Sequence, residues 1–151
     1  MLGSSAFAQS KKASGTNPKI IPAEWIPALA PSIKAALGDL EEANSQPEMN
    51  RLSRQVADMT DAQLFIAYVR LYERLPQKER DALLAEQAKW LKARTKAAED
   101  GVESEGGSLA PLEANNAAVT FTEKRLAELR ARLKALDAKK PSARAADDDA
   151  D

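Results

Sequence analysis

The sequence contains no cysteine and no histidine among its 151 residues. This excludes disulfides, thiolate and imidazole metal ligands, and nucleophile systems built on Cys or His. Aromatic residues make up only 5%, and a formal net charge of −1 argues against binding nucleic acid or a membrane surface through bulk charge. There is no apolar run of about 18 residues, the length that a membrane span needs, and no glycine-rich phosphate loop.

Carboxylates are the remaining groups that could do acid and base chemistry. They are spread over so much of the chain that no tuned pair stands out. We therefore predict a protein that is not an enzyme and that uses no cofactor and no metal.

The composition, 44% hydrophobic and 30% charged, suits one domain with a modest core. At the N-terminus, Ala6 and Ala8 bracket Phe7 in the small-x-small pattern that signal peptidase reads. We expect residues 1–8 to be the remnant of a signal peptide and the protein to be periplasmic or secreted. It would be cytoplasmic if residues 1–8 are not such a remnant.

The rest of the chain divides by composition. Prolines at 18, 22, 27 and 31 predict that residues 9–31 form a flexible, proline-rich segment without a long helix. A helical domain is predicted over residues 32–140, and its short first helix begins near Ser32, a good helix cap. The acidic ending "SARAADDDAD" predicts a disordered tail over residues 141–151.

Three long helices are predicted within this domain. The first is capped by Ser45 and ends near Arg74, with a break near Thr60 as an alternative, and Pro76 makes a tight connection to the second. The second runs from about Gln77 to Glu99, and the third lies between about residues 109 and 140. No segment alternates with a period of two, so the predicted class is all-α: an antiparallel helical hairpin with a third long helix and a short N-terminal helix, in a small bundle.

Apolar side chains recur every three to five residues along these helices, which is typical of a buried face. The last helix carries leucines with a 3-4-3 spacing; this run is too short to require a coiled-coil dimer, and core packing is favoured. The predicted core positions are Leu52, Val56, Met59, Leu64, Tyr68, Leu71, Leu75, Leu83, Leu84, Trp90, Leu91, Phe121, Leu126, Leu129, Leu133 and Leu136.

Two polar residues share the apolar face of the second long helix, because Gln87, Trp90 and Arg94 are spaced by three and four. If the hairpin turns at Pro76, Asp61 lies within about 4.5 Å of the height of Arg94 along the helix axes. We predict an Asp61–Arg94 pair, with Asp58 as the reserve partner. In the alternative, Arg94 lays its stem along Trp90 and keeps its charge in water.

An ordered set of short motifs from Gln46 to Leu133 resembles the LprI-type lysozyme-inhibitor domain, most of whose members have no assigned function. In that family a helix beginning near Met-Asn leads to Asp-x-x-Leu and a Tyr. The next helix carries Gln-x-x-Trp-(Leu/Ile)-x-x-Arg, and a later one Thr-x-x-Arg-x-x-x-Leu. The matching residues here are Met49, Asn50, Asp61, Leu64, Tyr68, Gln87, Trp90, Leu91, Arg94, Thr122, Arg125 and Leu129.

The chain departs from the family pattern at five positions. Leu52, Ala98 and Ala117 stand where family members usually carry cysteines. A disulfide closing a loop of about 20 residues would contribute roughly 3 kcal/mol, so packing or the added N-terminal segment must replace it. Thr95 replaces the Asp that commonly follows the motif Arg, and Phe65 replaces an Asn.

The resemblance implies an exported binding protein that occupies a partner's cleft without chemistry of its own. The favoured contact is the acidic, glycine-containing stretch that carries Glu99, Asp100, Glu103 and Glu105, and the partner is a lysozyme or another cationic envelope protein. A solvated connection kept polar for solubility is the alternative for this stretch. The alternative function is a structural or adaptor domain of the cell envelope that acts through the Trp25 region or the last helix.

Overall fold

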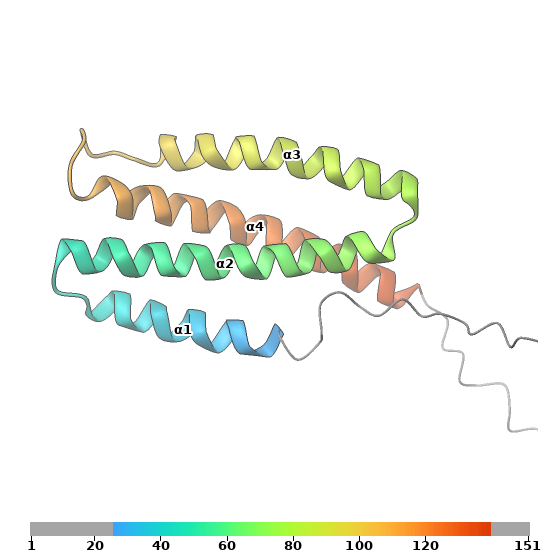
Figure 1. The fold of residues 1–151 in the computed structure, drawn as a ribbon, viewed down its shortest axis with the longest axis horizontal. Coiled ribbons are helices and arrows are strands. Elements are labelled where there is room, and N and C mark those ends of the chain that lie inside the picture. Colours follow the sequence, from blue (N-terminus) through green and yellow to red (C-terminus); the bar gives the residue numbers. More distant parts are fainter. Residues whose placement is uncertain (1–25, 140–151) are drawn as a thin grey trace, which may run out of the picture.

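The computed structural model describes residues 26–139, with side chains from residue 30 on. It contains four helices: α1 (Ile26–Glu42), α2 (Gln46–Arg74), α3 (Gln77–Asp100) and α4 (Ala110–Ala138) (Figure 1). The predicted all-α helical bundle is confirmed. The predicted signal remnant, the Trp25 region and the acidic tail lie outside the described residues.

Helix α1 begins earlier than the sequence predicted. It starts at Ile26 rather than near Ser32 and continues through Pro31. Pro27 lies in the first turn, where its missing N–H has no intrahelical partner to lose, so only Pro31 removes a backbone hydrogen bond from the helix. One lost bond did not end the helix, and the prediction that the prolines exclude helix up to residue 31 was wrong in this part.

Helix α2 starts and ends as predicted. The hydroxyl of Ser45 accepts a hydrogen bond from the amide of Glu48 at 3.4 Å, and a proline occupies the first turn. The alternative of a break near Thr60 is not realised, because the helix is continuous and the Thr60 hydroxyl donates to the Val56 carbonyl at 2.8 Å.

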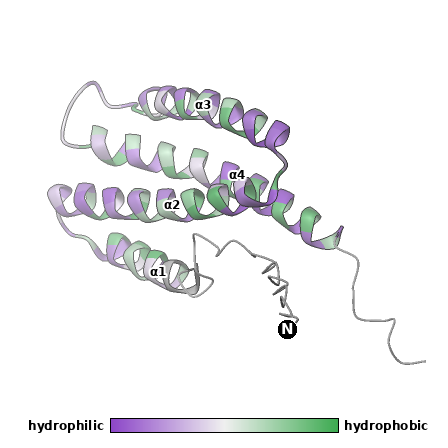
Figure 2. Cartoon of the chain, turned by 45° about the vertical axis from the view of Figure 1, so that its right-hand side comes forward, coloured by the Kyte–Doolittle hydropathy of each residue, from purple (hydrophilic) through white to green (hydrophobic). Residues whose placement is uncertain are grey.

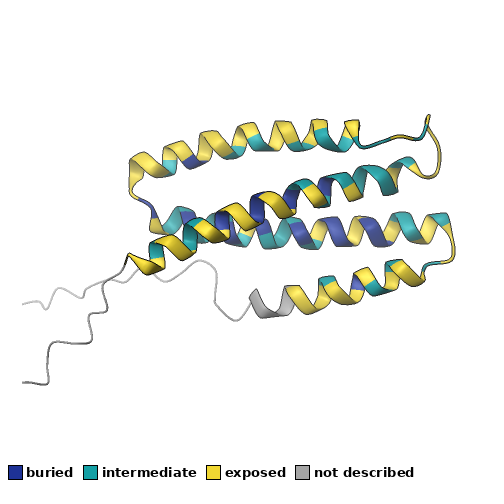
Figure 3. Cartoon of the chain, turned by 180° about the vertical axis from the view of Figure 1, so that it is seen from behind, coloured by how far each residue is buried: buried dark blue, intermediate teal, exposed yellow. Residues whose placement is uncertain are grey.

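The four helices lie side by side in the order α3, α4, α2, α1 (Figure 1, Figure 3). The two arms of the hairpin, α2 and α3, run antiparallel as predicted, but α4 inserts between them. Helix α4 packs on both arms, and α1 packs on the far side of α2. The α1–α2 turn and the loop between α3 and α4 therefore lie at the same end of the molecule.

The core forms where α2, α3 and α4 meet, and hydrophobic residues alternate with hydrophilic ones along each helix (Figure 2). In Figure 3 the buried residues follow α2 and α4, the two central helices. The predicted core is confirmed for most positions. The main cluster consists of Leu64, Ala67, Leu71, Leu75, Leu83, Leu126 and Leu129, with Tyr68, Tyr72, Trp90, Leu133 and Leu136 packed against it.

Two predicted core positions are wrong. Leu84 and Leu91 are 48% and 50% exposed. Each follows an inward-facing residue, Leu83 or Trp90, by one position, which rotates it by about 100° around the helix. Because α3 packs mainly on α4 and contacts α2 through only a few side chains, its inward face is too narrow to bury these two leucines.

Candidate functional site

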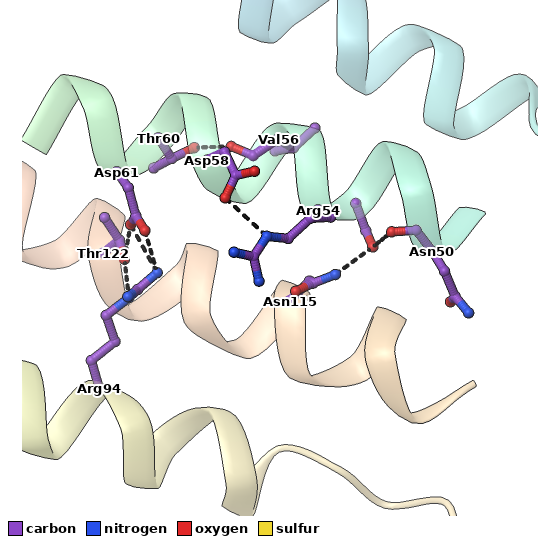
Figure 4. Close-up of polar contacts among 10 residues, drawn as sticks. Asn50, Arg54, Val56, Asp58, Thr60, Asp61, Arg94, Asn115 and Thr122 are labelled. Carbon is purple, nitrogen blue, oxygen red and sulfur yellow. Dashed lines mark hydrogen bonds and ion pairs between the residues drawn. The ribbon is translucent and has the colours of Figure 1, made fainter. Parts of the chain in front are cut away.

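Arg94, Asp61 and Thr122 meet where α3, α2 and α4 face one another (Figure 4). The Nη2 of Arg94 donates to both carboxylate oxygens of Asp61, at 2.7 and 2.8 Å, and its Nε donates to the Thr122 hydroxyl at 2.9 Å. That hydroxyl lies 3.4 Å from Asp61 Oδ1 and can donate to it. The predicted Asp61–Arg94 pair is confirmed, and a buried Thr hydroxyl completes it.

The other two expectations for this region are resolved by the same contacts. The reserve partner, Asp58, instead pairs with Arg54 on its own helix at 2.9 Å (Figure 4). The guanidinium of Arg94 does lie over the ring of Trp90, 5.9 Å from the ring centroid, but its charge is held by Asp61 rather than by water alone. Arg94 therefore pairs with Asp61, as predicted, and also lies against Trp90, as the alternative expected.

Gln87 and Arg125 form a second polar contact, between α3 and α4. Arg125 is only 6% exposed, and its Nε donates to the side-chain oxygen Oε1 of Gln87 at 3.3 Å. The same guanidinium is 2.9 Å from Glu128 and 3.4 Å from Glu86, and Arg132 lies 2.8 Å from Glu86. Burial disfavours charge on Glu86, but hydrogen bonds and charges from Arg132 and Arg125 outweigh this and lower its pKa.

Aromatic residues close the space beside these contacts. Trp90 stacks on Phe121 with ring centroids 5.9 Å apart, and Tyr68 lies 6.3 Å from Tyr72. Burial, reinforced by neighbouring Tyr72, raises the pKa of the Tyr68 hydroxyl against an opposing effect of Arg125. The polar and aromatic motif residues thus contact one another across three helices, an arrangement that fixes the bundle.

A third polar contact joins α2 to α4 nearer the loop end of the molecule. Asn115 donates to the hydroxyl of Ser53 at 2.9 Å, and this hydroxyl donates to the Asn50 carbonyl at 3.0 Å (Figure 4). Ser53 is almost fully buried. Sequence reasoning missed it, although a Ser on the apolar stripe of a helix is itself a signal that a polar partner lies opposite.

The four predicted partner-binding carboxylates lie at or near the loop between α3 and α4, and all are exposed. Glu99 and Asp100 end α3, whereas Glu103 and Glu105 belong to the loop. Asp100 is already bonded to Lys96, at 2.8 Å, and its hydrogen bond and charge raise the pKa of that lysine. Among residues 26–139, no ion pair involves the carboxylates of Glu99, Glu103 or Glu105.

The loop between α3 and α4 is anchored by hydrogen bonds to both α4 and α2. Oε2 of Glu113, in the first turn of α4, accepts from the amide of Glu103 at 3.2 Å and from the amide and hydroxyl of Ser104 at 3.1 and 2.7 Å. At the far end of the loop, Asn50 on α2 donates to the Ser108 carbonyl at 2.7 Å. Glu113 was not among the predicted site residues, because its partners lie about ten residues away, beyond the reach of helix periodicity.

Close packing occurs at one of the three positions where the family usually has a cysteine. A Cβ added at Gly101 would lie 2.4 Å from the Cβ of Ala117, so the end of α3 approaches the first half of α4 as closely as glycine permits. Leu52 is buried on α2. Ala117 and Leu52 are thus packed against neighbouring residues without a crosslink.

Within residues 26–139, no group of three or more acidic, His or Cys residues is placed to hold a metal ion. The helices in this range also include none with the length and apolar character that crossing a membrane requires.

Comparison with known proteins identifies the domain. The family model described as "Lysozyme inhibitor LprI" matches residues 38–129, which run from the last turns of α1 into the second half of α4. The match therefore includes the Asp61–Arg94–Thr122 contact, the Gln87–Arg125 contact and the whole loop. Neither the curated proteins nor the solved structures gave a match. The chain belongs to the lysozyme inhibitor LprI family.

Proposed function

We propose that this protein binds a lysozyme or another cationic envelope protein and acts by occupying the partner's cleft, with no catalysis of its own. The family match is the observation that carries this proposal. The polar motif residues are bonded to one another, and Thr122 and Arg125 are buried, so the more exposed groups are better placed to contact a partner.

The loop between α3 and α4 offers such groups. Glu99, Glu103 and Glu105 project unpaired carboxylates from one end of the molecule, and Asp100 adds a fourth that Lys96 already neutralises in part. Negative charge gathered on one surface attracts a basic partner and speeds its association. On this proposal, the first three carboxylates contribute most to binding, and Asp100 contributes least.

An inhibition assay tests this function. We expect the full chain to inhibit a chicken-type or goose-type lysozyme, more strongly at 0.02 M than at 0.15 M salt, because screening shortens the reach of surface charge to about 8 Å at the higher salt. The triple variant E99Q/E103Q/E105Q should lose most of the inhibition with unchanged helicity. A chain that inhibits neither enzyme at tens of micromolar, at either salt concentration, would overturn the proposal.

An adaptor domain of the cell envelope is the second candidate, and exposed apolar residues favour it. Phe65 is 63% exposed on α2, one turn after Asp61, and Leu91 is 50% exposed on α3, one turn before Arg94. The Asp61–Arg94 bond joins α2 and α3 one turn away from each of these residues. A contiguous exposed apolar patch marks a protein contact, whereas single exposed apolar residues are ordinary. If Phe65 and Leu91 form such a patch, F65S/L91S should abolish binding to an envelope protein and leave lysozyme activity unchanged.

Export is part of the first proposal and rests on the small-x-small pattern at Ala6 and Ala8. Fractionation of the native host would test it. Recovery of the protein in the envelope or medium, cut before Gln9, is the expected result, and a cytoplasmic protein with residues 1–8 intact would contradict it.

A further inference from the structure

The loop between α3 and α4 is tied to the bundle at both ends of its central stretch. One carboxylate oxygen of Glu113 accepts three hydrogen bonds from two consecutive residues, Glu103 and Ser104. Both amides and the hydroxyl point at the same atom, so the chain must turn around Glu113 in one conformation. Protein hydrogen bonds to a charged acceptor are the stronger kind.

The second anchor comes from a different helix. Asn50 of α2 donates to the carbonyl of Ser108, and its own side-chain oxygen accepts from Gln46 at 2.9 Å, which orients the amide. Between the two anchors, Gly106 has a φ of 62°, a backbone conformation that favours glycine. The loop thus has a defined course between its anchors.

The acidic residues of this region divide into one that holds the loop and two that face solvent. Glu113 turns inward, toward the loop backbone, and is only partly exposed, whereas Glu103 and Glu105 are exposed. A flexible acidic loop would lose conformational entropy when it met a partner, and a loop already held in one conformation loses less.

We propose that Glu113 is a positioning residue for partner binding: it presets the conformation of residues 101–109, so that the affinity for a cationic partner depends on a carboxylate that does not itself contact the partner. This inference rests on the proposed function. On this proposal, binding requires that the side-chain oxygen of Glu113 accept hydrogen bonds from the loop; its negative charge alone is not sufficient.

Three variants separate the acceptor from the charge. E113Q removes the charge and keeps a carbonyl oxygen that can accept the same bonds; E113A removes both; S104A removes one donor at constant charge. For binding to hen-type lysozyme in 0.15 M salt, we expect E113A to raise Kd about tenfold and S104A about threefold, with E113Q closer to wild type than to E113A. Equal losses in E113Q and E113A, both abolished by high salt, would show that only charge matters and would overturn the proposal.

A second measurement does not depend on any partner. Amide-hydrogen exchange and ¹⁵N relaxation of residues 101–109 should show a mobile loop in E113A and an ordered one in wild type and E113Q. A loop that becomes mobile in E113A while lysozyme binding stays at the wild-type Kd would also overturn the proposal. If wild type binds no lysozyme but the loop responds as described, the proposed function fails while the positioning of the loop by Glu113 stands.

Discussion

Arg94 on α3 and Asp61 on α2 are joined by two hydrogen bonds of 2.7 and 2.8 Å across a gap in which α3 packs on α4 rather than on α2. The bond therefore joins the two arms of the hairpin, α2 and α3, although α4 packs between them. Thr122 of α4 contributes the third group, so one polar contact connects three helices.

A double-mutant cycle measures this contact. We expect Asp61→Ala and Arg94→Ala each to lower the free energy of unfolding by about 1–2 kcal/mol, because each leaves a partly buried group without its partner. The double variant should cost little more than the worse single one, with a coupling of about 1 kcal/mol, since Asp61 is 40% exposed and partly screened by water. Additive losses in urea unfolding would show that the pair is not coupled.

Two neighbouring residues on α3 should respond very differently to truncation. Trp90 packs against the core and on Phe121, so Trp90→Ala should destabilise the fold by about 2–4 kcal/mol. Leu91 is half-exposed, and Leu91→Ala should change stability by no more than about 0.5 kcal/mol. Thermal unfolding of the two variants tests which face of α3 points to the core. Similar melting temperatures would mean that the inward face is wrongly assigned.

The glycines of the loop region provide another matched pair. Gly101→Ala would place a Cβ 2.4 Å from that of Ala117 and should destabilise the protein by about 1–3 kcal/mol. Gly107→Ala meets nothing within 4 Å and should be neutral within about 0.5 kcal/mol. The denaturant midpoints of the two variants should therefore differ. Equal midpoints would contradict the close approach of α3 and α4.

The loop should respond to acid through Glu113. Hydrogen bonds from the hydroxyl and amide of Ser104 and from the amide of Glu103 lower the pKa of this carboxyl below its ordinary 4.5. The charged form is thus favoured in the folded loop, and the stabilisation is present above the ordinary pKa and is lost as the pH falls through the lowered value.

We therefore expect the NMR signal of the Ser104 amide to shift in a titration below pH 4.5, while the same signal in E113Q does not follow that titration. The variant serves as the control because Gln has no proton to gain. A midpoint above 4.5 in wild type would contradict the inferred hydrogen bonds.

The helices and most of the core could be predicted from the sequence because capping residues and apolar periodicity are local signals. Ser45 and Pro76 marked the ends of α2 correctly, and the Asp61–Arg94 pair followed from counting helical rise on either side of the turn. The place of α4 between the two arms could not be predicted. Periodicity shows which face of a helix is apolar, but it does not show which other helix covers that face.

The errors have the same origin. Leu84 and Leu91 were assigned to the core because an apolar residue beside a buried one looks buried until the number of neighbouring helices is known. The four prolines were expected to exclude a long helix before Ser32, although Pro31, in the second turn of α1, removes only one backbone bond. Glu113 acquires its role through partners nine and ten residues away, beyond the reach of helix periodicity, and Ser53 has a partner, Asn115, that lies 62 residues away.

The central claim, that the acidic loop binds a cationic lysozyme, is tested most directly by calorimetric titration of lysozyme with wild type and two triple variants. E99Q/E103Q/E105Q removes the unpaired loop carboxylates, and E79Q/D81N/E123Q removes as many exposed acidic groups elsewhere on α3 and α4. We expect the loop variant to weaken binding by at least about tenfold at 0.05 M salt, and the control variant by less than about threefold. Equal affinities for the two variants, or no heat of binding from wild type, would contradict the account.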